Sequence, residues 1–96
     1  MIIRYYNQVT DIIQKCHGNQ LTELDVTKCL SLEYLECEGN RLSGLDVSKC
    51  SSLETLGCYD NQLSKLDLTN CTQLTQLYCD PDVTVIGYTE KRVNMQ

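Results

Sequence analysis

The chain has no phenylalanine and no tryptophan among its 96 residues, and it holds a single histidine and a single proline. Its core must therefore be filled by leucine, valine, isoleucine, tyrosine and cysteine. Basic residues are also scarce, because eight lysines and arginines face thirteen aspartates and glutamates, which gives a formal net charge of −5. A phosphate backbone and an anionic membrane surface both attract basic patches, so neither is an expected partner.

Long hydrophobic segments are missing as well. No run in the sequence approaches the roughly 18 apolar residues that a membrane-spanning helix needs, so we expect no membrane insertion. The N-terminal sequence MIIRYYNQVTDII has neither the sustained apolar stretch nor the small-residue cleavage site of a secretory signal peptide. Either the protein is intracellular or an export signal belongs to a longer parent chain.

What the sequence does have is repetition with a period of 21 residues. The segments CHGNQLTELDVTKCLSLEYLE, CEGNRLSGLDVSKCSSLETLG and CYDNQLSKLDLTNCTQLTQLY follow one another directly. One such unit cannot bury its leucine face alone, whereas stacked neighbours can, so the repetition predicts a solenoid. Two cysteine columns and one asparagine column share the period: Cys16, Cys37, Cys58 and Cys79; Cys29, Cys50 and Cys71; and Asn19, Asn40 and Asn61.

The pattern within each unit predicts its local structure. In LEYLEC, Leu35 and Cys37 alternate with Glu36, which is typical of a short strand with one buried face. The asparagine that follows can both donate and accept hydrogen bonds at a tight bend. Asp46, followed two residues later by Ser48, suits a turn capped by a side chain on the opposite wall.

These patterns together predict one fold class. We expect an α/β-type solenoid that is mostly β, wound in the right-handed sense. Short parallel strands would form its concave face, and turns or short 3-10 segments would form its convex wall.

The sequence LEYLECEGNRL reads LxxLxCxxNxL and resembles the leucine-rich repeat, with cysteine where a leucine usually lies. The resemblance covers about residues 16–82. Within it, LDVSKC, LDLTNC and NQL resemble the 21-residue repeats of bacterial surface proteins, including internalins that carry a cysteine ladder. Asparagine more often occupies the positions of Cys29, Cys50 and Cys71 in those relatives, so the second sulfur column is a departure. The resemblance implies a binding module that is exposed at the cell surface or secreted as part of a full-length parent.

The repeat divides the chain into three parts. Residues 1–15 are expected to form an N-terminal cap or degenerate repeat, as a hairpin by their β-branched content or as a helix by their apolar spacing. Residues 16–82 hold three repeats and the strand of a fourth, and residues 83–96 a closing strand and a polar tail. The apolar residues of the first segment exceed what a cap easily hides, which predicts a weak homodimer through about residues 1–15.

The seven cysteines are predicted to be reduced and structural, with a disulfide or a metal or redox role as the alternatives. Stacked strands hold parallel side chains about 4.8 Å apart, whereas a disulfide needs Cβ atoms at roughly 3.5–4.5 Å that face each other. No CxxC pair is present, and a straight column does not converge as zinc ligands must. Adjacent residues of a strand face opposite sides of the sheet, so Cys16 and His17 are not expected to form a catalytic dyad. We therefore expect no metal, no cofactor and no catalytic residue.

The outward strand positions of successive units should form columns on the concave face. A face of four strands and about five residues each has a projected area of about 300 Å², against about 800 Å² per partner in a standard interface. A face of this size favours a small or weakly bound ligand, or it is one part of the binding surface of a larger array. One predicted column holds His17, Glu38, Tyr59 and Asp80, and the next holds Lys15, Glu36, Gly57 and Tyr78.

Tyrosines among acids on this face suggest a recognition surface, since tyrosine supplies rigid amphipathic contact area. The two glutamates would select basic or hydroxyl-rich groups of a protein or glycan ligand. We therefore predict an interaction module rather than an enzyme. The alternatives are a spacer or fragment of a longer array without a ligand of its own, and a metal- or redox-linked cysteine protein. The candidate binding residues are Tyr34, Glu36, Glu38, Tyr59, Tyr78 and His17.

Overall fold

The computed structural model describes residues 13–15, 18, 20–88 and 94–95, and all the regular structure there is β. This agrees with the expected mostly-β fold, while the short 3-10 segments that we allowed for do not occur among the described residues. In that part of the chain no helix has the length and apolar character needed to cross a membrane. The strands are β1 (Ile13–Lys15), β2 (Tyr34–Glu36), β3 (Thr55–Gly57), β4 (Lys65–Asp67), β5 (Gln76–Tyr78), β6 (Thr84–Ile86) and β7 (Asn94–Met95).

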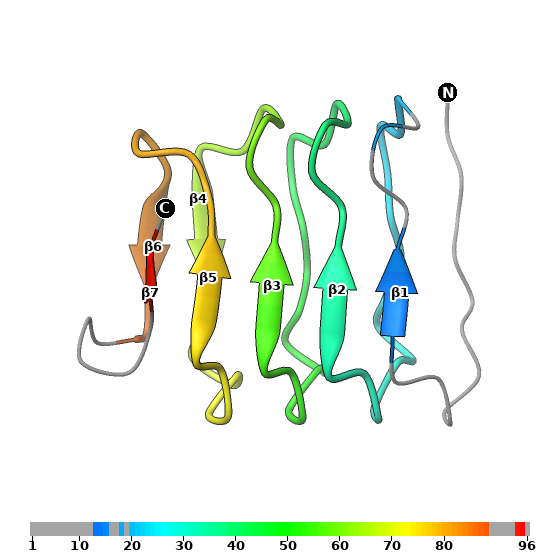
Figure 1. The fold of residues 1–96 in the computed structure, drawn as a ribbon, viewed down its shortest axis with the longest axis vertical. Helices are drawn as coiled ribbons and strands as arrows, with labels where there is room; N and C mark the ends of the chain where they lie inside the picture. The colour runs from blue at the N-terminus through cyan, green and yellow to red at the C-terminus, as the bar shows by residue number, and fades with distance from the viewer. Residues whose placement is uncertain (1–12, 16–17, 19, 89–93, 96) are drawn as a thin grey trace.

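The main sheet has the strand order β1-β2-β3-β5-β7, and every neighbouring pair is parallel. Figure 1 shows β1, β2, β3 and β5 side by side and pointing the same way. Ile13 pairs with Tyr34, Tyr34 with Thr55, and Thr55 with Gln76, so each partner lies 21 residues further along the chain. Equivalent residues of successive units therefore stack in columns across the sheet.

The second sheet lies on the other wall and consists of β4 and β6, which are also parallel. In Figure 1, β4 runs against the direction of β5, because the chain returns along this wall before it enters the next strand of the main sheet. Lys65 pairs with Thr84, only 19 residues later. The closing strand predicted within VTVIGY is therefore β6, and it extends the second sheet.

The polar tail predicted after the closing strand of residues 83–96 contains one further strand. Asn94 and Met95 form β7, which pairs with Gln76 and Leu77 of β5 and adds a fifth strand to the main sheet. Strand pairing depends on backbone groups, so a polar segment can join a sheet edge without an alternating hydrophobic pattern to announce it.

Each described repeat turns on the second wall through two consecutive tight turns. The N–H of Cys29 donates to the carbonyl of Val26 at 3.1 Å, and the N–H of Leu32 donates to the carbonyl of Cys29 at 3.2 Å. Cys50 and Cys71 lie at the same place in the next two units and make the equivalent bonds. The second cysteine column therefore marks the corner where the chain leaves one wall for the other.

Rows of leucine, valine and cysteine fill the space between the two walls. Every strand from β2 to β5 directs its central leucine inward, and these four side chains are at most 1 % exposed. Complete burial of such a side chain contributes about 1.5–3 kcal/mol relative to exposure. The fully buried core comprises Leu21, Val26, Cys29, Leu32, Leu35, Cys37, Leu42, Cys50, Leu53, Leu56, Leu68, Cys71, Leu74 and Leu77.

The asparagine column satisfies backbone groups at the bend after each strand. Asn40 is buried, and its Oδ1 accepts the N–H of Leu21 at 2.9 Å while its Nδ2 donates to the carbonyl of Cys37, also at 2.9 Å. Asn61 accepts the N–H of Leu42 at 2.9 Å in the same way. Each asparagine therefore ties its own unit to the preceding one, and buried backbone groups that would otherwise be costly are paired.

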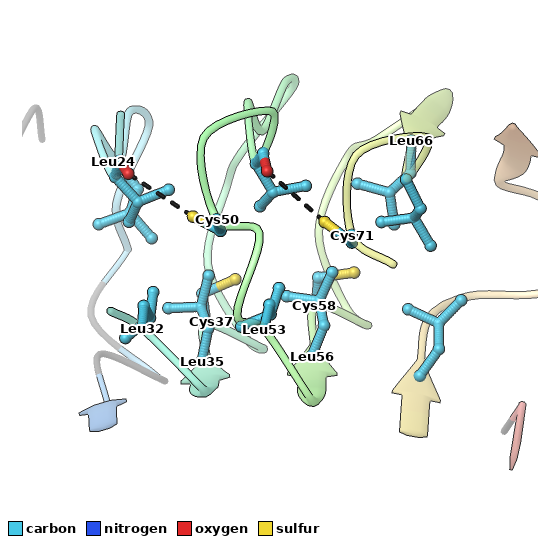
Figure 2. Packing of buried hydrophobic residues seen from close by; sticks show 14 of the residues in the cluster. Leu24, Leu32, Leu35, Cys37, Cys50, Leu53, Leu56, Cys58, Leu66 and Cys71 are labelled. Carbon is cyan, nitrogen blue, oxygen red and sulfur yellow. Dashed lines mark hydrogen bonds between the residues drawn. The ribbon is translucent and has the colours of Figure 1, made fainter. Parts of the chain in front are cut away.

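The six described cysteines are buried, form no disulfide and lie in two rows. Figure 2 shows Cys37 and Cys58 in the row beside the main sheet, and Cys50 and Cys71 in the row at the opposite corner. In the second row the Sγ of Cys50 donates to the carbonyl of Val26 at 3.6 Å, and the Sγ of Cys71 donates to that of Val47 at 3.5 Å. These thiols link consecutive units. An asparagine at the same positions would also have a hydrogen-bond donor for this link.

The buried thiols are expected to make the fold sensitive to alkali. Burial raises the pKa of Cys50 and of Cys58 to about 12, mainly because a thiolate is poorly solvated in the core. Above about pH 9 the unfolded chain releases thiol protons that the folded chain retains, so the free energy of unfolding falls as pH rises. Each such thiol should contribute a decrease of about 1.4 kcal/mol per pH unit.

Urea unfolding at a series of alkaline pH values measures this slope. The variant Cys58→Val lacks one of the two thiols. Its unfolding free energy should therefore fall less steeply with pH than that of the original chain, by about 1.4 kcal/mol per pH unit. An identical slope in the two proteins would show that Cys58 does not titrate differently in the folded and unfolded states.

Several sequence-based predictions fall on residues outside the described part of the chain. They are the hairpin or helix of the N-terminal cap and the homodimer contact. Of the segment 1–15, only the last three residues are described, and they form β1. Cys16, His17 and Asn19, the first members of their columns, also lie outside the described residues.

Candidate functional site

A hollow of about 250 Å³ lies on the solvent side of the main sheet, the face that we predicted to be concave. We call this side of the sheet the sheet face. Five of the six candidate binding residues come together there, and His17 lies outside the described residues. The hollow is lined by Tyr34, Glu36, Glu38, Thr55, Gly57, Tyr59 and Tyr78.

Gly57 creates the hollow because it places no side chain in the middle of the sheet face. It lies in β3, where its register partners are Glu36 on one side and Tyr78 on the other. A Cβ atom at Gly57 would lie 3.4 Å from Oε1 of Glu38 and 3.9 Å from the backbone oxygen of Leu35. The glutamate carboxylate therefore reaches close to the bare backbone of β3, at the floor of the hollow.

Glu38 holds the least satisfied polar atom of the site. Its Oε1 is enclosed and has no hydrogen-bond partner, although the side chain as a whole is only partly buried. Buried carboxylate oxygens normally accept hydrogen bonds, and leaving one without a donor is unfavourable. A ligand with a hydrogen-bond donor could supply the missing partner once the Glu38 side chain turned toward the hollow.

Tyr34 and Glu36 interact within β2. The phenol of Tyr34 donates a hydrogen bond to Oε1 of Glu36 at 2.7 Å. This bond favours the protonated phenol and, with the negative charges of Glu36 and Glu38, raises the pKa of Tyr34. Tyr34 therefore presents a neutral ring to the hollow and is held in place by its neighbour.

Asp80 was predicted to lie in the same column as Glu38 and Tyr59, but its carboxylate is turned to the backbone. The N–H of Asp60 donates to both carboxylate oxygens, at 3.0 and 2.9 Å. Asp60 has a φ of +57°, in the left-handed region that is uncommon outside glycine. Asp80 thus stabilises an unusual turn, and the sequence signal that we overlooked is an acid directly before Pro81, where the repeat pattern ends.

Two larger hollows, of about 490 and 530 Å³, lie on the second wall beside the aspartates of the capped turns. The carboxylates of Asp25, Asp46 and Asp67 each accept a backbone N–H two residues later at 3.0 Å. Hydrogen bonds from the hydroxyl and backbone of Thr69 lower the pKa of Asp67. These acids are occupied by the turn itself, so the sheet face is the better candidate although its hollow is smaller.

The described residues contain no group of three histidine, cysteine, aspartate or glutamate side chains that could hold a metal ion. The thiols nearest to the hollow belong to the buried row behind the sheet. Burial raises the pKa of Cys58 and of Cys79, so both stay protonated at neutral pH, whereas thiolates are the form that binds metals or attacks substrates.

Comparison with known proteins identifies the class of fold. Searches against protein-family models and against curated proteins each gave no match. The structure is similar to an internalin-type leucine-rich repeat domain with a cysteine ladder. That solved structure is the functional domain of InlJ from Listeria monocytogenes, which this chain matches with a TM-score of 0.69 and 26% sequence identity.

The match covers 79% of this chain and 20% of the InlJ chain. The resemblance read from LxxLxCxxNxL and from the cysteine columns is thereby confirmed at the level of the fold. The matched part of this chain therefore spans about a fifth of the length of the InlJ structure.

Proposed function

We propose that the chain is a leucine-rich repeat module that binds another protein on its sheet face. The observation that carries the proposal is the hollow at Gly57, where three tyrosines and two glutamates of different strands meet. Tyrosine combines an apolar ring with a polar tip and is enriched at protein interfaces. The likeness to a cysteine-ladder domain of InlJ supports a binding role by analogy of fold.

The size of the hollow indicates what can enter it. Small-molecule pockets usually measure about 300–1,000 Å³, and this one is about 250 Å³. A single side chain of a partner suits it better than a whole cofactor. With a projected face of about 300 Å², the module would bind weakly alone and tightly only within a longer array.

The proposal includes exposure at a bacterial cell surface or secretion, by analogy with the internalin-type domain. It also includes right-handed winding, the usual sense of connections between parallel strands. The spacer alternative is less favoured, because an idle surface gives no reason to enclose an unpartnered carboxylate oxygen at Glu38. The redox or metal alternative is less favoured because the described thiols are buried.

Selection of random displayed peptides on the immobilised chain tests the proposal. Peptides that the chain retains should bind the variant Tyr59→Ala about tenfold or more weakly, since central aromatic residues dominate such interfaces. Tyr59 is 42% exposed, so the melting temperature of the Tyr59→Ala variant should equal that of the original chain. Titration calorimetry and thermal melts measure the two quantities.

Leu30→Ala is the matched control, because Leu30 is a large apolar residue that is 51% exposed and does not line the hollow. It should leave peptide binding intact. Peptides that bind both variants as well as the original chain, or a selection that retains none, would support the spacer reading instead.

A further inference from the structure

We propose that the hollow on the sheet face receives one basic side chain of the partner protein, with arginine preferred to lysine. This inference rests on the proposed function, since it names the group that the same site would recognise. Three features of the hollow carry it: an unpartnered carboxylate oxygen, a set of tyrosines, and the absence of a basic residue among its lining residues.

The carboxylate of Glu38 is the first of these features. Oε1 of Glu38 is enclosed, lacks a donor and lies 3.4 Å from the place that a Cβ atom of Gly57 would take, at the floor of the hollow. Once the Glu38 side chain turns toward the hollow, a guanidinium or ammonium group there would donate a charge-assisted hydrogen bond to it, which is roughly twice as strong as one between neutral groups. An anionic ligand would instead meet two glutamates, and an apolar ligand would leave Glu38 without a partner.

The aromatic residues favour a cation as well. Tyr34 comes from β2, Tyr78 from β5, and Tyr59 follows β3, so the three surround the glycine from different strands. Cations bind to the faces of aromatic rings, and the planar guanidinium of arginine also stacks on them. A guanidinium can stack on a tyrosine ring and also donate two hydrogen bonds to a carboxylate, which is the reason for expecting arginine before lysine.

The charge of the surroundings is complementary to such a ligand. Gly57 pairs only with Glu36 and Tyr78 in the sheet register, so neither of its neighbours in the column is basic. Lys15 pairs with Glu36 on the side away from Gly57. The whole chain carries a formal charge of −5, which attracts a basic partner and makes the association sensitive to salt.

Amide chemical shifts of the isotope-labelled chain test the inference directly. The probes are the blocked amino acids N-acetyl-arginine, N-acetyl-lysine and N-acetyl-glutamine, each as its methylamide. The arginine probe should shift the signals of Gly57, Tyr59 and Tyr78 with millimolar affinity, the lysine probe should bind more weakly, and the neutral glutamine probe should have no effect. High salt should reduce binding of the two basic probes.

Two variants locate the interaction. Glu38→Gln removes the charge and should weaken the arginine probe about tenfold. Gly57→Ala adds a single Cβ atom at ordinary contact distance from Glu38 and should weaken binding while it keeps the melting temperature. Glu54→Gln is the charge-matched control, because Glu54 is exposed and does not line the hollow, and it should bind like the original chain.

The inference is overturned if the glutamine probe binds as well as the arginine probe, or if neither basic probe shifts these signals. It is also overturned if Glu54→Gln weakens binding as much as Glu38→Gln, which would indicate general attraction to an acidic surface. Failure of the basic probes with continued loss of selected peptides in Tyr59→Ala would leave the proposed function intact. Failure of both experiments would remove the proposed function as well.

Discussion

Replacement of Cys58 by aspartate should prevent the chain from folding at neutral pH. Cys58 is 1% exposed and lies between Cys37 and Cys79 in the row behind the main sheet. Glu38 and Asp80 lie near enough to raise the pKa of its thiol, so a carboxylate there would be buried and also repelled. An uncompensated buried charge costs about 3–5 kcal/mol, a large part of the about 5–15 kcal/mol that stabilises a whole domain.

Far-ultraviolet circular dichroism and the soluble yield measure the effect. The matched control is Cys58→Val, which nearly conserves volume and should cost less than about 1.5 kcal/mol. If the valine variant proves as damaging as the aspartate variant, the thiol makes a specific interaction that volume alone does not replace. If the aspartate variant folds normally, Cys58 is not enclosed in solution.

Replacement of Asn40 by alanine should destabilise the chain by about 1–3 kcal/mol. The change leaves the buried N–H of Leu21 without its side-chain partner, and one unsatisfied buried group costs about 1–3 kcal/mol, whereas the carbonyl of Cys37 still accepts from Nδ2 of Asn61 at 3.0 Å. Urea unfolding measures the loss. A cost below about 0.5 kcal/mol, as at an ordinary surface position, would show that water replaces the amide without penalty.

The variant Asn40→Asp separates the acceptor from the donor of this amide. A carboxylate can still accept from Leu21, but only its protonated form can donate to the carbonyl of Cys37. The pKa of the introduced group should therefore be raised in the folded chain, so the variant retains more stability near pH 4 than near pH 7. Gln62→Glu adds the same charge at an exposed position and should not show this dependence.

The core and the main sheet could be predicted from the sequence because both depend on the repeat. Leu35, Leu56 and Leu77 are 21 residues apart, and a parallel stack brings such residues together on one side of the sheet. A register shift of one residue would turn every buried side chain outward. A periodic hydrophobic pattern therefore determines strand pairing and burial together.

The details of the site depend on features that are not periodic. Gly57 is the one residue of its predicted column that lacks a side chain, and only its neighbours in space show that a hollow results. Asp80 occupies a predicted surface position but is drawn to the turn at Asp60. The second sheet was also missed, because Lys65 and Thr84 pair at a spacing different from that of the repeat.

The shared spacing of the ladders has a consequence for how such a chain can change its length. Duplication or deletion of a unit that begins at Cys37 and ends at Gly57 keeps every following leucine, thiol and asparagine in its column. An insertion of another length that shifts the register between Val47 and Asn61 separates Asn61 from Leu42 and Cys71 from Val47. Changes in chain length are therefore tolerated as whole units. An array of this kind can become longer or shorter by one unit at a time while its fold stays the same.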